Sequence, residues 1–262
     1  MGIRIASQDT QSDCKSTKFA TSTEGLFAIM NRNLSGKVAI ITGSTLGLGK
    51  AAALLFAREG ASVVICDRGR VPERHKIMIE ESTNLSGNIF YQKCDVMKKN
   101  DILSLVQFTL KRFNRIDIMV NNAGIGMLKS IEDTSSNEWK NIMENNLESV
   151  FNCTKSVIPH MRENGGGSII NLASVASYVG FADDAAYCAS KGGVLMLTRQ
   201  TALDYSKENI RVNSICPGFI ETPELIHYLS QTENPKLERQ KVIDYHPIGR
   251  IGTTEEVANV AL

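Results

Sequence analysis

Short apolar runs rich in β-branched residues alternate with stretches of helical periodicity from Lys37 onward. Such runs predict strands, and they occupy residues 38–42, 62–66, 89–94, 116–120, 168–172 and 211–216. Between them, apolar residues recur at the spacing of amphipathic helices in 47–59, 72–85, 100–113, 136–162 and 185–206. Strands that alternate with helices form parallel sheets covered on both faces. The pattern therefore predicts an α/β fold, a doubly wound sheet of six parallel strands in a single domain.

A long connection separates the sixth predicted strand from the last predicted helix. Residues 219–252 contain Pro223, Pro235 and Pro247 and predict a partly helical excursion over one edge of the sheet. Connections of this length in a compact domain often cover a site. Because a further helix begins after Thr253 and no residues then remain for a seventh strand, we expect that strand to be missing, with a strand edge and apolar helix surface left exposed.

The first 33 residues differ from the rest of the chain. They are rich in Ser and Thr, carry charges of both signs and lack a continuous apolar core. They therefore resemble neither a signal peptide nor a strong transit peptide. We expect a disordered leader over residues 1–33 and one domain, incomplete at its C-terminus, over 34–262.

The composition narrows the classes of function. With 42% hydrophobic residues, 22% charged residues and a formal net charge of +1, the chain offers no basic surface for nucleic acid. No apolar run approaches the roughly 18 residues of a membrane span. We expect no nucleic-acid or membrane partner, and a cytoplasmic location with an organellar one left open. The six cysteines form no CxxC pair and the four histidines show no ligand spacing, which predicts no metal site.

The first predicted strand runs directly into a glycine-rich turn. Residues 42–49 read TGSTLGLG, and the Ala-rich helix KAAALLFAREG follows at once. Glycines allow close backbone approach, and a helix N-terminus offers unpaired N–H groups to a phosphate. An ordinary tight turn is the alternative, but the strand and helix on either side favour a dinucleotide site. Its candidate residues are Gly43, Thr45, Leu46, Gly47, Leu48 and Gly49.

An acidic residue follows the second predicted strand. Asp67 stands eighteen residues after Gly49, where a carboxylate can accept hydrogen bonds from the adenosine ribose hydroxyls. The same carboxylate repels a 2′-phosphate, which favours NAD over NADP, although the adjacent Arg68 could attract that phosphate. A solvated turn residue is the other interpretation of Asp67.

Polar residues also follow the third and fourth predicted strands. Asp95 and Val96 follow the third strand, and the sequence Asn-Asn-Ala-Gly over 121–124 follows the fourth. Open α/β sheets bind ligands at the carboxyl ends of their strands. These residues therefore extend the predicted site.

The fifth predicted strand delivers Ser174, and Tyr187 and Lys191 stand four residues apart on the helix that follows. This spacing puts the phenol and the ammonium on one helix face. A nearby ammonium stabilises a phenolate, so we expect Lys191 to lower the pKa of Tyr187 and make it a usable general acid or base. A surface pair on an amphipathic helix is the alternative for the two residues taken alone.

Together these motifs have the order and spacing of a known family. The segments TGSTLGLG, NNAG, Ser174, YCASK and Pro217-Gly218 resemble the single-domain, "classical" branch of the short-chain dehydrogenases/reductases over about residues 34–262. The resemblance implies a Rossmann-like dinucleotide-binding domain. It also implies hydride transfer between NAD(H) and an alcohol or carbonyl substrate.

The resemblance further implies roles for individual residues. Ser174 would hold the substrate oxygen, Tyr187 would exchange the proton and Lys191 would also bind the nicotinamide ribose. Asn146 would support a proton-relay water, with its neighbour Asn145 as the residue to test against it. The remaining residues of the implied cofactor site are Asp95, Val96, Asn122, Ala123, Gly124, Pro217, Gly218, Ile220 and Thr222. Capping or strand-end roles are the alternatives for Asn146, Ser174 and Thr222.

Two other functions remain open at this point. One is an NADP-dependent 3-oxoacyl thioester reductase, a role common in similar sequences, and the other is a catalytically silent nucleotide-binding scaffold. The substrate pocket would be lined by residues 125–128, by 175–184 and by the excursion after Gly218. We expect its two acidic residues, Asp183 and Asp184, to be solvated rather than in contact with substrate. The expected partners are a small alcohol or ketone and, by resemblance, further copies of the chain in a homodimer or homotetramer.

Overall fold

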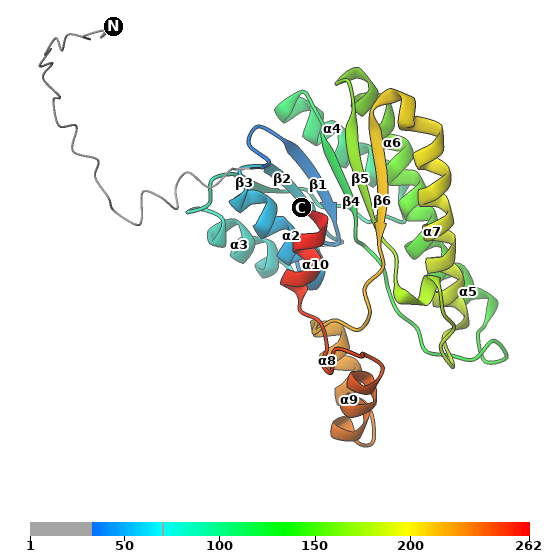
Figure 1. Cartoon of the computed structure of the whole chain (residues 1–262). Coiled ribbons are helices and arrows are strands. Elements are labelled where there is room, and N and C mark those ends of the chain that lie inside the picture. The colour runs from blue at the N-terminus through cyan, green and yellow to red at the C-terminus, as the bar shows by residue number, and fades with distance from the viewer. Residues whose placement is uncertain (1–32, 70) are drawn as a thin grey trace, which may run out of the picture. The chain divides into compact units, whose positions relative to one another are not determined.

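The computed structural model describes residues 33–69 and 71–262 (Figure 1). The leader expected over residues 1–33 lies outside these described residues, apart from its last residue. Six strands form one parallel sheet in the order β3-β2-β1-β4-β5-β6. Their bounds are β1 Val38–Thr42, β2 Ser62–Cys66, β3 Asn88–Tyr91, β4 Ile118–Asn121, β5 Gly167–Leu172 and β6 Ile210–Ile215. The predicted α/β, doubly wound parallel sheet is confirmed.

Both faces of the sheet are buried, which explains the continuous apolar character of its central strands. Alternate residues of a strand point to opposite faces. Accordingly, Ala39 and Ile41 of β1 belong to one apolar layer and Ile40 to the other. Every residue of β1 is buried, so the strand reads as an unbroken run of apolar and β-branched residues.

Helices cover the two faces in two layers. The first layer contains α2 (Gly47–Arg58), α3 (Pro72–Glu81) and α10 (Thr254–Ala261). The second contains α4 (Lys99–Phe113), α6 (Ser149–Glu163) and α7 (Ala185–Tyr205). Figure 1 shows α2, α3 and α10 on the side of the sheet opposite to α4 and α6. The strand order reverses between β1 and β4, and ligands of open α/β sheets bind beside such a reversal.

Several predicted elements have different bounds in the structure, and the helix predicted over 72–85, for example, ends at Glu81. The third strand ends at Tyr91 rather than at residue 94, although the Cys94 N–H still donates to the Asp67 carbonyl at 2.9 Å, in register with the pairing of β2 and β3. The fourth strand begins at Ile118 rather than at residue 116. The single helix predicted over 136–162 is α5 (Ser136–Met143), a π-helical turn η1 (Glu144–Glu148) and α6. A π-helical turn inside a longer helix is frequent at functional sites.

The connection over residues 219–252 carries two short helices, as the predicted partly helical excursion requires. They are α8 (Pro223–Ser230) and α9 (Pro235–Asp244). Their apolar cluster of Leu225, Leu229, Val242 and Ile251 is separate from the two layers under the sheet. In Figure 1, α8 and α9 project beyond the carboxyl ends of the strands.

The described ranges contain neither a membrane-spanning helix nor a group of metal-ligating side chains. Over residues 33–69 and 71–262, no helix combines the length and apolar character that crossing a membrane requires. In the same part of the chain, no three His, Cys, Asp or Glu side chains group as a metal site would need.

Candidate active site

A crevice of about 1660 Å³ opens at the carboxyl ends of the strands. It contains residues from every motif singled out in the sequence. The predicted residues that line it are Gly43, Thr45, Leu46, Gly47, Leu48, Asp67, Asp95, Val96, Asn122, Ala123, Gly124, Ser174, Tyr187, Lys191, Pro217, Gly218, Ile220 and Thr222. Gly49 and Asn146 lie behind this lining, and both contact residues within it.

The glycine turn is locked to the end of β4. The Thr42 hydroxyl accepts hydrogen bonds from the backbone N–H groups of Asn122 and Ala123, each at 3.1 Å. The Asn122 amide donates to the Thr42 and Gly43 carbonyls, each at 2.9 Å. A Cβ at Gly49 would lie only 2.5 Å from Asn122 Nδ2 and 2.7 Å from the Gly43 oxygen. Close backbone packing is therefore the reason for glycine at position 49.

The N-terminus of α2 fits the pyrophosphate of a dinucleotide. No side chain caps this helix at Leu46, and its first turn has no acidic residue. Side-chain caps are present on α5, α8, α9 and α10, and α3, α4 and α7 also begin without one. The first N–H groups of α2 thus keep their positive end of the helix dipole free for an anion. Because α2 starts in the crevice lining, the residues present suit a bound phosphate group.

Asp67 closes the other end of the same cradle. Its carboxylate accepts hydrogen bonds from the Thr45 hydroxyl, from the Gly69 N–H at 2.6 Å and from the Tyr91 hydroxyl at 3.0 Å. The side chain is only partly exposed, so Asp67 is not the freely solvated turn residue that was the alternative. Arg74, on the first turn of α3, lines this end of the crevice as well.

Tyr187 and Lys191 face the same space. The Lys191 ammonium nitrogen lies 5.7 Å from the centre of the Tyr187 ring and donates to the Leu172 carbonyl at 2.7 Å. Ser174 lines the crevice next to the Tyr187 side chain and lowers the pKa of its phenol. A Cβ at Gly124 would be 3.5 Å from the Lys191 nitrogen, so the end of β4 passes directly beside the pair. The phenol, the ammonium and the glycine turn therefore belong to one crevice.

The electrostatics of this pair differ from the sequence-based expectation. Burial raises the pKa of Tyr187 to about 12, while the neighbouring Ser174 side chain lowers it and the charges of Glu224 and Asp184 raise it further. Burial also lowers the pKa of Lys191 to about 8. The prediction that Lys191 lowers the pKa of Tyr187 is therefore not met by the protein groups alone. Both groups are withdrawn from water, which disfavours the phenolate and the ammonium alike.

Asn146 holds the beginning of α7 in place from behind the lining. Its side chain accepts from the Ile125 N–H at 2.8 Å and donates to the Ile125 carbonyl at 2.9 Å. It also donates to the Ser190 hydroxyl at 3.1 Å, and Ser190 donates to the Tyr187 carbonyl at 2.8 Å. The neighbouring Asn145 borders the crevice. Asn146 thus connects the end of β4 to the turn that carries Tyr187, and its role in a proton relay stays a prediction.

Ser174 and Thr222 both act as helix caps while they line the crevice. The Ser174 hydroxyl accepts from the Ala176 N–H at 3.2 Å at the start of a short 3₁₀ turn, and Thr222 accepts from the Leu225 N–H at 3.2 Å at the start of α8. Capping was the alternative for Thr222. In the structure this role does not remove the residue from the crevice, because a threonine can cap with its hydroxyl and present its methyl group elsewhere.

Both Asp183 and Asp184 are expected to be solvated, and the structure agrees with this for Asp183 but not for Asp184. Asp183 is exposed, but Asp184 is only 9% exposed and borders the crevice. The only side-chain partner of the Asp184 carboxylate among the described residues is the Cys188 thiol at 3.9 Å, and burial raises the pKa of Asp184 to about 7. Asp184 was expected to be solvated, and that was wrong because α7 begins there and its first turn packs into the site.

The sequence-based prediction did not single out two residues of the site, Glu224 in the crevice lining and Tyr91 behind it. Glu224, on the first turn of α8, accepts from the Gly126 N–H at 3.3 Å across the crevice. Tyr91, the last residue of β3, donates to Asp67. Neither residue stands in a recognisable motif. The only available signal was position, since Glu224 comes two residues after Thr222 and Tyr91 lies within the third predicted strand.

The chain belongs to the short-chain dehydrogenase/reductase family, as residues 37–233 match the family of short chain dehydrogenases. It is 38% identical over 230 residues to the 3-oxoacyl-[acyl-carrier-protein] reductase FabG of Thermotoga maritima, covering 87% of this chain and 90% of the relative. It is 36% identical over 233 residues to the cyclohexanol dehydrogenase of an Acinetobacter species, with 88% of each chain covered.

A solved structure of a short-chain dehydrogenase/reductase from Burkholderia xenovorans superimposes on the chain with a TM-score of 0.84 and 32% identity. The match covers 88% of this chain and 90% of that one. The family, the relatives and the crevice together define an NAD(P)-dependent oxidoreductase that acts on alcohol and carbonyl groups.

Proposed function

We propose that this chain transfers a hydride between NAD(H) and a small, uncharged alcohol or ketone, with Tyr187 as the general acid–base. One observation carries the proposal. Tyr187 lies beside Ser174, with its ring centre 5.7 Å from the Lys191 ammonium, in the same crevice as the N-terminus of α2, which no side chain caps. A proton-transferring group and a dinucleotide cradle are the two parts that such a reaction needs.

Each residue of the site has a defined task in this proposal. When bound, the nicotinamide supplies the hydride donor or acceptor. The Ser174 hydroxyl holds the substrate oxygen beside Tyr187, whose phenolate takes the alcohol proton in oxidation and whose phenol returns it in reduction. Lys191, held by the Leu172 carbonyl at 2.7 Å, stabilises the phenolate as it forms. Asn146 keeps the turn of Tyr187 in register through Ser190.

The cofactor preference rests on Asp67. A carboxylate fixed at the end of β2 accepts hydrogen bonds from the ribose hydroxyls of NAD and repels the 2′-phosphate of NADP. Arg68 and Arg74 line the same end of the crevice and support the NADP alternative. Comparison of NADH and NADPH in binding and in turnover decides between the two.

The charges at the substrate end support an uncharged substrate. Two lysines there have carboxylate partners, Lys129 with Glu138 at 2.7 Å and Lys241 with Glu238 at 3.0 Å. Asp184 and Glu224 form no ion pair within the described residues, and both act on Tyr187 by raising its pKa. The Glu224 carboxylate, joined by that of Asp184 above its pKa of about 7, disfavours an anionic substrate beside the reacting group.

A second candidate is the reduction of 3-oxoacyl thioesters. The FabG relative, at 38% identity over 230 residues, supports it. Acyl thioesters and free ketones, each tested with both nucleotides, separate this candidate from the first one.

Substitution of Tyr187 tests the proposed function. Tyr187→Phe should lower turnover by about a thousandfold or more, since general acid–base groups contribute on that order, while the Kd for NADH changes by less than about twofold. NADH fluorescence on mixing measures binding, and a panel of ketones and secondary alcohols measures turnover. Tyr205→Phe is the matched control, because Tyr205 packs at the far end of α7 against the apolar layer under the sheet.

Two results would contradict the proposal. Near-normal turnover in Tyr187→Phe would remove the phenol from the mechanism. Binding of NADH by the unmodified chain without turnover on a broad panel would favour the catalytically silent scaffold instead.

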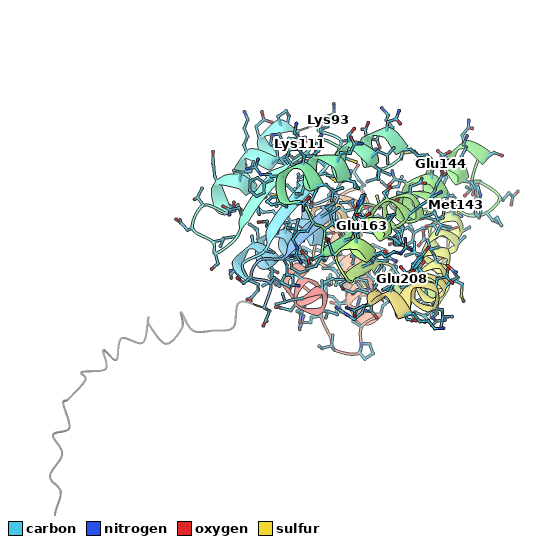
Figure 2. The ribbon with its side chains drawn as sticks, turned by 90° about the horizontal axis from the view of Figure 1, so that it is seen from above. Lys93, Lys111, Met143, Glu144, Glu163 and Glu208 are labelled. Atoms are coloured by element: carbon cyan, nitrogen blue, oxygen red, sulfur yellow. The ribbon has the colours of Figure 1, made fainter. Side chains whose placement is uncertain are left out.

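We further propose residues 34–262 as the catalytic domain and a homodimer or homotetramer as the assembly. An apolar groove of about 750 Å³ between α5 and α7 supports the assembly. Trp139, Phe151 and Met196 line this groove and are 40%, 47% and 59% exposed. Met143 and Glu144 also line it, and Figure 2 shows them well apart from Lys93, which lies beside the Asp67 end of the crevice. A partner bound in the groove would therefore leave that end of the crevice open.

A further inference from the structure

The carboxylate of Asp67, which follows the end of β2, is fixed by several hydrogen bonds from other protein groups. Three donors reach it, namely the Thr45 hydroxyl, the Gly69 N–H at 2.6 Å and the Tyr91 hydroxyl at 3.0 Å. Two of these come from its own neighbourhood, the glycine turn and the loop after β2. Tyr91 comes from β3, whose pairing with β2 places it opposite Ile65.

Tyr91 is itself held on two sides. The His75 imidazole of α3 stacks on its ring with 3.8 Å between ring centres and 8° between planes. At Gly69, whose φ is +68°, a Cβ would lie 3.2 Å from the Tyr91 hydroxyl and 3.2 Å from Lys93 Cδ. Stacking and this tight loop leave the phenol little freedom to turn away. Its hydroxyl is therefore aimed permanently at Asp67.

The hydroxyl also stays a donor. Burial, followed by the charge of Asp67 and the hydrogen bond to it, raises the pKa of Tyr91 above its usual value. A phenol beside a carboxylate keeps its proton and gives it to the hydrogen bond. Asp67 consequently receives a charge-assisted bond from Tyr91 across the working pH range.

We propose that Tyr91 is a positioning residue for cofactor choice, because its hydroxyl fixes the Asp67 carboxylate where the adenosine ribose hydroxyls bind. The inference rests on the proposed preference for NAD. A carboxylate held by three donors keeps its remaining lone pairs in one direction and needs no rearrangement when a ribose arrives. Without Tyr91, the carboxylate can turn toward Arg68 or Arg74, and both its hold on the ribose and its repulsion of a 2′-phosphate weaken.

Tyr91→Phe removes only the hydroxyl and leaves the ring for His75. We expect the KM for NADH to rise about tenfold, the usual range for one hydrogen bond to a charged group. The kcat should stay within about twofold, since the reacting end is untouched. The ratio of kcat/KM for NADPH to that for NADH should rise by about tenfold or more. Tyr205→Phe, with an equal chemical change remote from the crevice, should alter none of these.

A double-mutant cycle separates positioning from a general structural role. In an Asp67→Asn background, Tyr91→Phe should raise the KM for NADH by less than about twofold further, since the partner it positions is already changed. The inference is overturned if Tyr91→Phe leaves the KM for NADH within about twofold of the unmodified enzyme, or if its effect is undiminished in the Asp67→Asn background.

A failure of the proposed NAD preference gives a different result from a failure of the inference about Tyr91. An unmodified chain that turns over faster with NADPH than with NADH contradicts the NAD preference, and the inference falls with it. An unmodified chain that prefers NADH, together with an unaltered Tyr91→Phe variant, overturns the inference alone.

Discussion

Each end of the crevice contains a carboxylate, and the two differ in how well they are hydrogen-bonded. At the adenosine end, Asp67 is held by Thr45, Gly69 and Tyr91. At the substrate end, the only partner of the buried Asp184 carboxylate within the described part of the chain is the Cys188 thiol at 3.9 Å. A satisfied carboxylate is a fixed part of the structure, whereas a buried carboxylate without strong donors costs stability. The first end is thus built before any ligand arrives, and the second retains unused polar capacity.

The surrounding chain explains this contrast. The adenosine end is built on the carboxyl ends of the neighbouring strands β1, β2 and β3. The hydrogen bonds of the sheet fix the positions of these strands relative to one another. The substrate end depends on residues 219–252, which have an apolar cluster of their own. Phe219 joins the beginning of that segment to its later part by stacking on Tyr245 and by an N–H donated to His246 Nε2 at 3.0 Å. Substrate selectivity can therefore change by substitutions in one excursion while the cofactor cradle stays intact.

The largest effect is expected from a substitution of Gly49, where the adenosine end is tightly packed. In Gly49→Ala, the new Cβ would meet Asn122 Nδ2 at 2.5 Å, the Gly43 oxygen at 2.7 Å and Ser44 Cα at 2.8 Å. We expect the free energy of unfolding to fall by about 2 kcal/mol, as for other overpacked sites. We also expect the Kd for NADH to rise by about thirtyfold or more, because the glycine turn must shift. Urea unfolding and NADH fluorescence titration measure the two effects.

Gly192→Ala is the control for that substitution. Gly192 lies within α7, and a Cβ there would have nothing within 4 Å. The change should leave NADH binding unaltered and stabilise the helix by about 0.5–1 kcal/mol. Equal behaviour of the two alanine variants would show that the turn around Gly49 is not rigid, and the contrast between the two ends would disappear.

The sequence predicts the adenosine end better than the substrate end for a physical reason. The bounds of β1 and β2 agree with their buried runs, and the glycine turn and the Tyr187–Lys191 pair are patterns of neighbouring residues. Tyr91 reaches Asp67 across 24 positions of sequence, through the β2–β3 register. No local pattern encodes that register, because it depends on how two strands pair.

Asp183 and Asp184 show the same limit at the scale of one residue. They are adjacent and identical in type, yet one is exposed and the other is 9% exposed. Asp183 has a left-handed backbone with φ +55°, and Asp184 pairs with Lys129 in an isolated bridge next to α7. The burial of Asp184 is decided by this tertiary contact, which composition and periodicity do not contain.

A smaller effect should appear when the charge of the substrate end is altered. Glu224→Gln removes a carboxylate that raises the pKa of Tyr187 and also that of Lys191. We expect kcat/KM for a ketone that carries a carboxylate to rise by about threefold to fivefold relative to its uncharged ester, a modest factor because Glu224 is exposed. Steady-state rates with acetoacetate and its ethyl ester, at constant ionic strength, measure the change.

Glu233→Gln is the matched control for Glu224→Gln. Glu233 is exposed in the same excursion, between α8 and α9, and is not among the residues that line the crevice. It should leave the ratio of the two substrates unchanged. An equal shift in both variants would mean that only the net charge matters, and it would contradict a specific role for Glu224 in selecting uncharged substrates.

The smallest expected effect is a change with pH in the free energy of unfolding, caused by the burial of Asp184. Burial raises the pKa of this carboxyl from 3.8 to about 7 in the folded chain. Between these values the folded chain binds a proton that the unfolded chain has lost. The stability contributed by Asp184 is therefore complete below about pH 4 and declines as pH rises to about 7. Relative to Asp184→Asn, the unmodified protein should lose on the order of 1 kcal/mol of unfolding free energy over this interval. The full shift would give roughly 4 kcal/mol, but the carboxyl borders the open crevice and water there reduces the effect.

Urea unfolding of both proteins at closely spaced pH values measures this difference. Asp183→Asn provides the control, because Asn accepts the left-handed backbone at φ +55° and water hydrates this exposed carboxylate in both states. A difference between the unmodified protein and Asp184→Asn that stays flat from pH 4 to 7 would mean that Asp184 has donors as adequate as those of Asp67. The two ends of the crevice would then be alike in the property that most distinguishes them, and the excursion would have to be regarded as part of the rigid site.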